Sequence, residues 1–310
     1  MPKLTRKRVI LAKIETTYGT DPTPTGAANA ILVKDLDIQP IAASIVGRDL
    51  VRPYLGEFDQ LIANTHVECS FSVEMAGSGA AGTAPAYGPL LRACGLSETV
   101  SAGVSVTYAP VSTTFESVTM YYQVDGIQHK ITGARGTVDI DVSAGQIPAY
   151  KFKFTGIYNA PTDTALATPT YTGFITPLVA NNTNTTGFHF FSISNLVLES
   201  LSLSVNNSID FRALIGSEYA QLTDRRANGE VSFEAPTLAT FNAFSTALAT
   251  TTGNLDITHG TVAGNKVQIT SSKIDITQPS YGDSTGVVMI KCPFVLLPTS
   301  GNDEFSIVVK

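Results

Sequence analysis

The amino-acid sequence predicts a mainly β protein with two tandem β-sandwich domains, each carrying a short flanking helix and a long inter-strand loop. Charged residues make up only 15% of the chain, well below the usual share of about 25%. The 15 Phe and 11 Tyr residues, with frequent Thr and Val, favour strands over helices. The 310 residues suffice for two domains of about 100–200 residues each. A large helical bundle is excluded.

The first thirty residues are expected to form an N-terminal arm. Gly19–Gly26 reads Gly-Thr-Asp-Pro-Thr-Pro-Thr-Gly, which the interior of a helix or strand does not tolerate. A second segment of this kind, Pro161–Gly187, is rich in Thr, Asn and Pro. We therefore expect an arm at 1–30, a first β domain at 31–160, a linker at 161–187 and a second β domain at 188–310.

Strict alternation of apolar and polar residues marks the regular strands. Val138–Val142 places three apolar side chains on one face and two carboxylates on the other. Tyr150–Phe154 repeats the pattern with lysines outward, and Leu201–Val205 and Lys273–Thr277 repeat it with hydroxyls and charges. This pattern is typical of antiparallel strands with one face on a core and one face in water.

Short features recur in the same order in both halves of the chain. Arg52–Gly56 matches Arg212–Gly216, and Glu68–Phe71 matches Glu230–Phe233. Apolar residues at three- and four-residue spacing then predict a short helix in each half, at 87–94 and at 238–250. We interpret the shared order as an internal duplication.

Each half carries a long charged segment between its first two strands, Ser44–Ala63 and Asn206–Asn228. Connections longer than about 12–15 residues are uncommon without a function. One interpretation is an arm that docks on a neighbouring subunit through paired charges, and the other is a solvated hairpin tip. The residues concerned are Arg48, Asp49, Arg52, Glu57, Asp59, Asp210, Arg212, Glu218, Asp224, Arg225 and Arg226.

Charge and hydropathy exclude several classes of protein. A net charge of −6 argues against a dedicated nucleic-acid binder, whose affinity comes from cationic side chains on phosphates. The chain has neither a secretory signal nor the roughly 18 consecutive apolar residues of a membrane span, so we expect no membrane binding. Three widely spaced cysteines are expected to be buried, inert thiols.

No catalytic, cofactor or metal site is predicted. Gly77–Gly82 fits the pattern G-x-G-x-x-G, but Pro85 and Pro89 interrupt the helix that a dinucleotide site requires. His66 and Glu68 resemble half of a deaminase zinc site, whose cysteine ligands are absent. We do not expect an enzyme, and an unrecognised hydrolase built from scattered carboxylates stays an open alternative.

The opening of the chain resembles a known family. Residues 7–24 and 28–33 combine a strand, a Tyr-Gly turn, a Pro-rich bend and an Asn-Ala entry. This combination is similar to the start of the tail tube (major tail) proteins of long-tailed siphophages. The resemblance covers only this opening, and the duplicated β remainder agrees with it without being diagnostic.

The resemblance implies two tail-tube-like β-sandwich domains whose inner sheets join around a ring into one closed barrel. Such rings usually hold six domains, so two domains per chain imply a trimer acting as a pseudo-hexamer. Long loops and arms would hold stacked rings together into the tail tube of the virion, assembled in the host cytoplasm. Other tail proteins, such as the tape measure, baseplate hub and tail terminator, are the implied partners, and double-stranded DNA would pass through transiently.

A conduit for DNA should let the duplex pass without binding it. Because cationic side chains would bind the phosphates, a neutral or acidic wall is expected. Asp139, Asp141 and Asp275, on the wet faces of regular strands, are the lumen-facing candidates. Lys151 and Lys153 are expected to pair with these aspartates across the sheet. Two alternatives stay open: these residues solvate the surface of a monomer, or the chain is another phage structural or adhesin-like β-sandwich, such as a decoration or baseplate protein.

Overall fold

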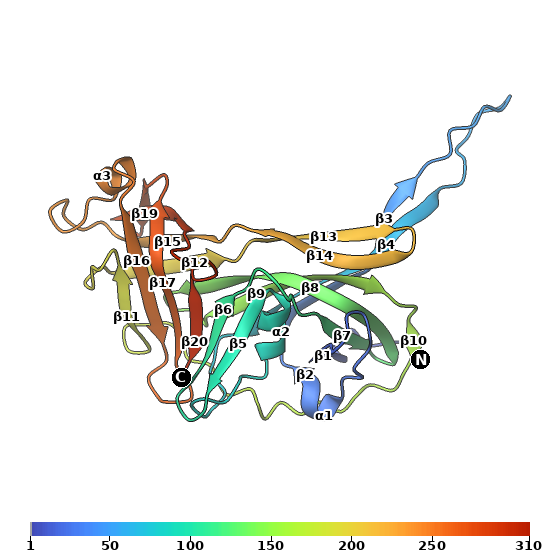
Figure 1. Ribbon diagram of the computed structural model, residues 1–310, viewed down its shortest axis with the longest axis horizontal. Coiled ribbons are helices and arrows are strands. Elements are labelled where there is room, and N and C mark those ends of the chain that lie inside the picture. Colours follow the sequence, from blue (N-terminus) through green and yellow to red (C-terminus); the bar gives the residue numbers. More distant parts are fainter. Residues whose placement is uncertain (1) are drawn as a thin grey trace.

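The computed structural model describes residues 2–310 and is mainly β, with three short helices among the described residues (Figure 1). The helices are α1 (Gly26–Asn29), α2 (Gly88–Ala93) and α3 (Ala243–Leu248). The strands of the first half are β1 (Arg8–Ile14), β2 (Ala30–Ile31), β3 (Lys34–Val46), β4 (Leu61–Glu74), β5 (Leu96–Ser101), β6 (Ser105–Pro110), β7 (Val118–Val124), β8 (Ile127–Ser143), β9 (Ala149–Tyr158) and β10 (Thr162–Asp163). Those of the second half are β11 (Thr185–Phe190), β12 (Leu198–Ser204), β13 (Asn207–Leu214), β14 (Ser217–Arg225), β15 (Asn228–Glu234), β16 (Thr252–His259), β17 (Val267–Ile276), β18 (Ser280–Ser284), β19 (Val287–Leu296) and β20 (Ser306–Val309).

One antiparallel layer runs through both halves of the chain, and we call it the long sheet. Its strands pair in the order β3, β4, β9, β8, β12, β15, β19 and β18. The two halves meet where β8 pairs with β12, with Asp139 opposite Ser204 and Asp141 opposite Ser202. Among the described residues, the strands at its two ends each have one partner: β3 pairs with β4, and β18 pairs with β19.

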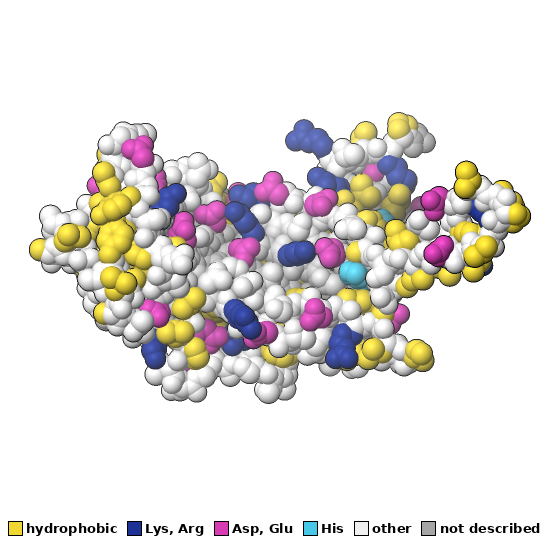
Figure 2. Space-filling view, turned by 90° about the horizontal axis from the view of Figure 1, so that it is seen from above, with side chains coloured by type: hydrophobic (Ala, Val, Ile, Leu, Met, Phe, Trp, Pro, Cys, Tyr) yellow, Lys and Arg dark blue, Asp and Glu magenta, His cyan; other side chains and the backbone are white. Residues whose placement is uncertain are grey.

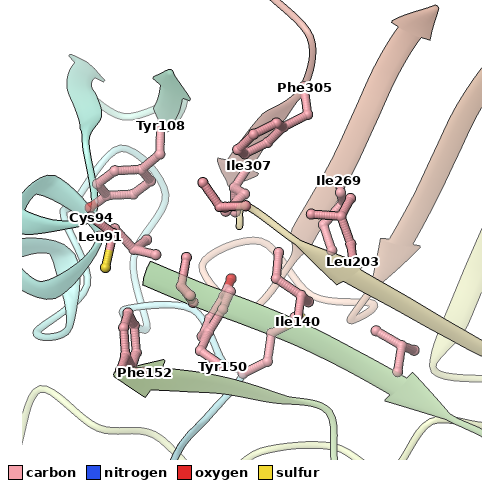
Figure 3. Packing of buried hydrophobic residues seen from close by; sticks show 14 of the residues in the cluster. Leu91, Cys94, Tyr108, Ile140, Tyr150, Phe152, Leu203, Ile269, Phe305 and Ile307 are labelled. Carbon is pink, nitrogen blue, oxygen red and sulfur yellow. The ribbon is translucent and has the colours of Figure 1, made fainter. Parts of the chain in front are cut away.

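The second layer also joins the two halves. At one end of the molecule β7 pairs with β8 and with β1, which pairs with β2. At the other end β17 pairs with β16 and β20, and β20 pairs with β6 of the first half. Tyr108 and Ile307 from this layer lie on the same core as Ile140 and Tyr150 from the long sheet (Figure 3).

The predicted alternation of the strands is confirmed. Val138, Ile140 and Val142 of β8 are buried, whereas Asp139 between them is exposed. In β9, Phe152 is buried between the exposed Lys151 and Lys153. The apolar face of each strand therefore packs on the core, as the period of two requires.

Both predicted helices are present and shorter than expected. Pro89 lies in the first turn of α2, where the backbone N–H that proline lacks would have no partner within the helix. Gly95, just after the helix, has φ of 77°, a left-handed conformation that commonly ends a helix. The side chain of Asn242 caps α3 by accepting a hydrogen bond from the Ser245 backbone N–H. Residues 238–241 precede that cap, so the helix begins later than its apolar spacing predicts.

The N-terminal segment does not project as an arm over residues 8–14. These residues form β1, which pairs along its whole length with β7. The run Val9–Ala12 is buried, because β1 has apolar neighbours on both faces.

The segment 161–187 begins with β10, paired to β8, and then follows the lower side of the body to β11 (Figure 1).

The two long charged segments differ in structure. In the first, β3 and β4 continue as a hairpin whose loop, residues 47–60, projects away from the body (Figure 1). The second is no loop: β13 and β14 form a two-stranded hairpin with a turn at Ile215 and Gly216. This hairpin lies along the first half of the chain, in contact with β8, β9 and β4.

Candidate assembly surfaces

The three lumen-facing candidates lie on one face of the β network. Cross-strand partners share a face, and one row of partners runs from Lys151 to Asp139 and Ser204. The same row continues through Asn228 and Val295 to Asp275. Asp141 lies two residues beyond Asp139 and therefore on the same face. We call this polar side of the long sheet the wet face.

Carboxylates neutralise Lys151 and Lys153 on this face. The Lys151 Nζ lies 3.0 Å from an Asp141 carboxylate oxygen, and the Lys153 Nζ lies 3.4 Å from Glu68. The predicted pairing across the sheet is therefore confirmed for Lys151, whereas Lys153 pairs with Glu68 and not with one of the three aspartates. Glu230, on the row that contains Asp141 and Ser202, lies opposite Pro293 and adds a carboxylate with no basic cross-strand partner.

The wet face is hollowed where the halves meet. A hollow of about 530 Å³ lies over β8, β12, β15 and β19. Its polar lining comes from Asp139, Asp141, Lys151, Ser202, Ser204, Asn228, Glu230 and Thr277. The Ser204 hydroxyl donates to Asp139 across the junction of the halves. The middle of the sheet therefore presents a concave, hydroxyl-rich surface with a surplus of acid.

The projecting loop 47–60 is braced by its own charged residues. Arg48 donates to Asp59 at 2.6 Å, which closes the base of the loop. The Arg52 guanidinium lies 4.0 Å from the centre of the Phe58 ring and donates to the backbone oxygen of Glu57. Val51 and Leu55 are fully exposed beside them. No described residue outside the hairpin covers this tip.

The charged residues of the β13–β14 hairpin make most of their contacts within the chain. Arg225 is nearly buried, lies 2.6 Å from Glu304 and donates to the backbone oxygen of Val111. Thr223 donates to Asp210, the Arg226 guanidinium pairs with Asp224, and the Arg212 guanidinium lies over the Tyr219 ring. Glu218 stands exposed beside the turn. The turn of this hairpin and its outward face, which includes Asp210, Arg212 and Asp224, stay exposed.

A contact that the sequence analysis missed holds this hairpin to the first half. Arg135 Nη1 donates to the Ala220 backbone oxygen, and the Asn207 side chain donates to the Cys94 backbone oxygen at the end of α2. Ala220 and Leu222 are buried in this contact. Their spacing of two residues was the available signal, and it indicates a strand with one covered face.

The residues that carry the family resemblance anchor the N-terminal segment. The buried Glu15 carboxylate accepts hydrogen bonds from the Ser117 and Thr119 hydroxyls and from the Gly133 N–H. The Tyr18 hydroxyl donates to the Gly133 oxygen and accepts from the Ala220 N–H. Gly133 has φ of 60°, and a Cβ there would meet the Tyr18 ring at 2.7 Å. Glycine is therefore required at this position.

Asp21 completes this anchor. It accepts hydrogen bonds from the Tyr121 hydroxyl and from Lys130 Nζ. Partial burial would raise the pKa of Asp21, but the hydrogen bonds from Tyr121, the Thr23 N–H and Lys130 outweigh it and hold the pKa below its usual value. The Tyr-Gly turn and the Asp-Pro bend of the N-terminal motif are thus fixed to β7 and β8.

The weak catalytic signals have structural explanations. The Gly77 N–H is bonded to Asn265, and the His66 ring stacks on Phe211 of the β13–β14 hairpin with centroids 4.9 Å apart. Cys69, Cys94 and Cys292 are buried, and burial raises the pKa of Cys69 and Cys292 to about 12. Over residues 2–310 no group of His, Cys, Asp and Glu has the arrangement of a metal site.

Within the described residues, none of the helices has the length and apolar character needed to cross a bilayer.

The comparison with known families agrees with the β architecture and the N-terminal anchor. The model of the family described as phage tail tube protein matches residues 5–295. No curated protein matches the chain. Because the match spans nearly the whole chain, this protein belongs to the phage tail tube protein family and is a structural component of the virion tail.

Proposed function

We propose that this chain assembles with copies of itself into rings that stack as the phage tail tube and form the conduit for DNA ejection. The observation that carries the proposal is the long sheet, which within the described residues has a strand with one open edge at each end, and which has a concave polar face. Each half contributes four strands to it. We propose that the halves, 31–160 and 188–310, are copies of one domain, so that three chains form a pseudo-hexameric ring.

Closing the long sheet into a barrel solves a physical problem of the monomer. An open strand edge presents unpaired N–H and C=O groups that invite aggregation. Ile41 and Ile45 of β3 and Tyr281 of β18 are also exposed. A closed barrel of copies has no such edges, because each terminal strand gains a partner.

The charge of the wet face suits the wall of a DNA conduit. Lys151 and Lys153 are paired with carboxylates, so they offer little free positive charge to phosphates. Asp139, Asp141 and Asp275 would line the bore and repel the duplex. Among the described residues Lys291, opposite Ser232, is an exposed cation of this face without an ion pair. A wall with few free cations releases few counterions on contact with DNA, so the duplex is held weakly.

We propose that contacts between rings come from the two hairpin ends. These are the loop 47–60, with Arg48, Asp49, Arg52, Glu57 and Asp59, and the exposed turn of the β13–β14 hairpin beside Arg212 and Glu218. The apolar side chains of Val51 and Leu55 give the loop a surface that a second ring can bury. Other tail proteins, such as a tape measure, baseplate hub and terminator, would meet the bore and the two ends of the tube.

Electron microscopy of the purified protein tests this function. The chain is concentrated from dilute solution and imaged at each step, and rings or hollow tubes are expected. Dispersed monomers at every concentration would reject the proposal. Binding to preformed capsids or to a glycan without tube formation would favour a decoration or adhesin-like protein instead.

A further inference from the structure

The strand order is the same in the two halves of the long sheet. The first half pairs β3, β4, β9 and β8, and the second half pairs β12, β15, β19 and β18. The repeated motif sets the correspondence. Ser70 of the first copy lies opposite Lys153, and Ser232 of the second copy lies opposite Lys291. Residues at equivalent positions in the two halves can therefore be identified by counting along each strand from this matched pair.

The chain contains one example of a joint between two such units. There the last strand of the first half, β8, pairs antiparallel with the first strand of the second half, β12, and Asp141 lies opposite Ser202. Within residues 2–310, the last strand of the second half, β18, and the first strand of the first half, β3, have no partner of this kind. Both belong to the same layer as the existing joint.

The correspondence gives the register of the missing joint. Asp141 is opposite Ala149 of β9, four residues before Lys153, and Ser284 is opposite Val287 of β19, four residues before Lys291. Ser284 thus corresponds to Asp141. Ser202 is opposite Glu230, and Gln39 is opposite Glu68 of the same motif, so Gln39 corresponds to Ser202.

We propose that β18 of one chain pairs antiparallel with β3 of a second copy, with Ser284 directly opposite Gln39. This inference rests on the proposed function and names the surface that closes the ring. The occupant of each open edge is a second copy of this chain, because the joint between β8 and β12 already shows how the two edge types fit. The pairing also extends the wet face unbroken from one chain to the next.

The hairpins support the same joint independently. The β13–β14 hairpin buries Ala220 and Leu222 against the first half, and a Cβ at Gly95, just beyond α2, would lie 3.0 Å from Leu222. The β3–β4 hairpin lacks such a partner and exposes Ile45 by 67% and Ile62 by 64%.

The surface that would receive the β3–β4 hairpin is also uncovered. Leu248, the last residue of α3, is 90% exposed, and Tyr281 of β18 is 65% exposed. Figure 2 shows hydrophobic side chains gathered at both ends of the molecule. The β3–β4 hairpin of one copy therefore packs beside α3 of the next, as the β13–β14 hairpin packs beside α2.

Disulfide cross-linking in assembled protein tests the register. Directly opposed residues on antiparallel strands have Cα atoms about 4.5–5.5 Å apart, within the range for a disulfide. The full chain carrying Gln39→Cys and Ser284→Cys is assembled, oxidised and separated on a non-reducing gel. Covalent trimers are expected as the largest product, because each chain then bonds to both neighbours. The native cysteines are buried and do not compete.

The matched control moves one cysteine to the other face of β3. Ile38 lies opposite Cys69, whose side chain points into the core, so both variants carry Cys69→Ser to prevent an intrachain disulfide. In this background Ile38→Cys with Ser284→Cys should give at least about tenfold less cross-linked protein than Gln39→Cys with Ser284→Cys. If the double variant does not assemble, an equal mixture of the Gln39→Cys and Ser284→Cys chains should give covalent dimers.

Two results separate failure of the inference from failure of the function. Rings or tubes that show no cross-link between positions 39 and 284, or as much with position 38, overturn the proposed joint and leave tube formation intact. Wild-type protein that never assembles rejects the proposed function itself.

Discussion

Replacing Glu15 should unfold the N-terminal anchor at a measurable cost in stability. The Glu15 side chain is 7% exposed and accepts from two hydroxyls, 2.6 Å away on Ser117 and Thr119, and from the N–H groups of Gly133 and Gly19, both at 2.7 Å. The hydroxyls can rotate toward other acceptors, but the Gly133 N–H is fixed in β8. A Glu15→Ala change leaves this donor unsatisfied.

The magnitude follows from these contacts. An unsatisfied buried donor costs about 1–3 kcal/mol, and each lost hydrogen bond to a charged group about 1.5–3 kcal/mol before relaxation. Because the hydroxyls relax, we expect Glu15→Ala to lower the free energy of unfolding by about 4 kcal/mol. That corresponds to a fall in Tm of about 8 °C for a chain of this size. Glu15→Gln keeps one acceptor oxygen and should cost about half as much.

Urea and thermal unfolding of the dilute monomer measure this effect. Glu218→Ala is the matched control, because Glu218 is exposed beside a turn and its loss should change stability by less than about 0.5 kcal/mol. A double-mutant cycle between Glu15→Ala and Thr119→Val should give a coupling of about 1–2 kcal/mol. If Glu15→Ala were no more destabilising than Glu218→Ala, the anchor would not contribute to folding.

Three further predictions concern assembly and pH. Deleting residues 48–60 should leave the fold intact by circular dichroism yet stop rings from stacking, and normal tube growth would contradict the role of this loop. Tubes carrying Asp139→Lys and Asp141→Lys should retain DNA at low salt in a filter-binding assay and release it as salt rises, whereas wild-type tubes that bind as much would refute the acidic bore. Burial lowers the pKa of His259, whose ring nitrogens contact Thr185 and the Leu178 oxygen. Because the unfolded state then binds the proton more readily, stability should fall as pH drops below about 6.5, by up to about 1.4 kcal/mol per pH unit, and His259→Asn should flatten this slope in urea unfolding.

Local patterns predicted the strands and their faces well. Alternation placed Val138 and Ile140 in the core and Asp139 and Asp141 on the wet face, because a strand has only two sides. The same alternation identified Asp275 as a wet-face residue, and the structure puts it in one cross-strand row with Asp139. The residues of this acidic surface could thus be predicted from the alternation within each strand.

Contacts between distant segments could not be predicted in the same way. The run Val9–Ala12 is apolar without alternation, which is the pattern of a strand covered on both faces. The neighbouring Pro-rich bend instead favours an irregular segment, and for this reason the sequence analysis predicts an arm. Charge made 206–228 resemble a solvated loop. It is a hairpin because Ala220 and Leu222 find a surface in the first half, and no local pattern encodes that surface.

The joint between β8 and β12 gives the proposed assembly a thermodynamic advantage. A ring of six separate domains must form six joints between free molecules, each opposed by the loss of translational and rotational freedom. Where two domains share a chain, half of these joints form at a high effective concentration set by a short connection. The segment 161–187 is held along the body by the hydrogen bond from the Ala167 N–H to Gln123 and by the backbone bonds of Ala180 with Gly145 and Gln146. Little freedom is therefore left to lose when the halves meet. The covalent joint can then be fully packed in the monomer, as the buried β13–β14 hairpin shows. The exposed β3–β4 hairpin and β18 edge are left as the surfaces on which association depends. A bulky charged substitution at Gln39 or Ser284, unlike the small cysteines of the cross-linking test, should therefore weaken assembly without altering the fold.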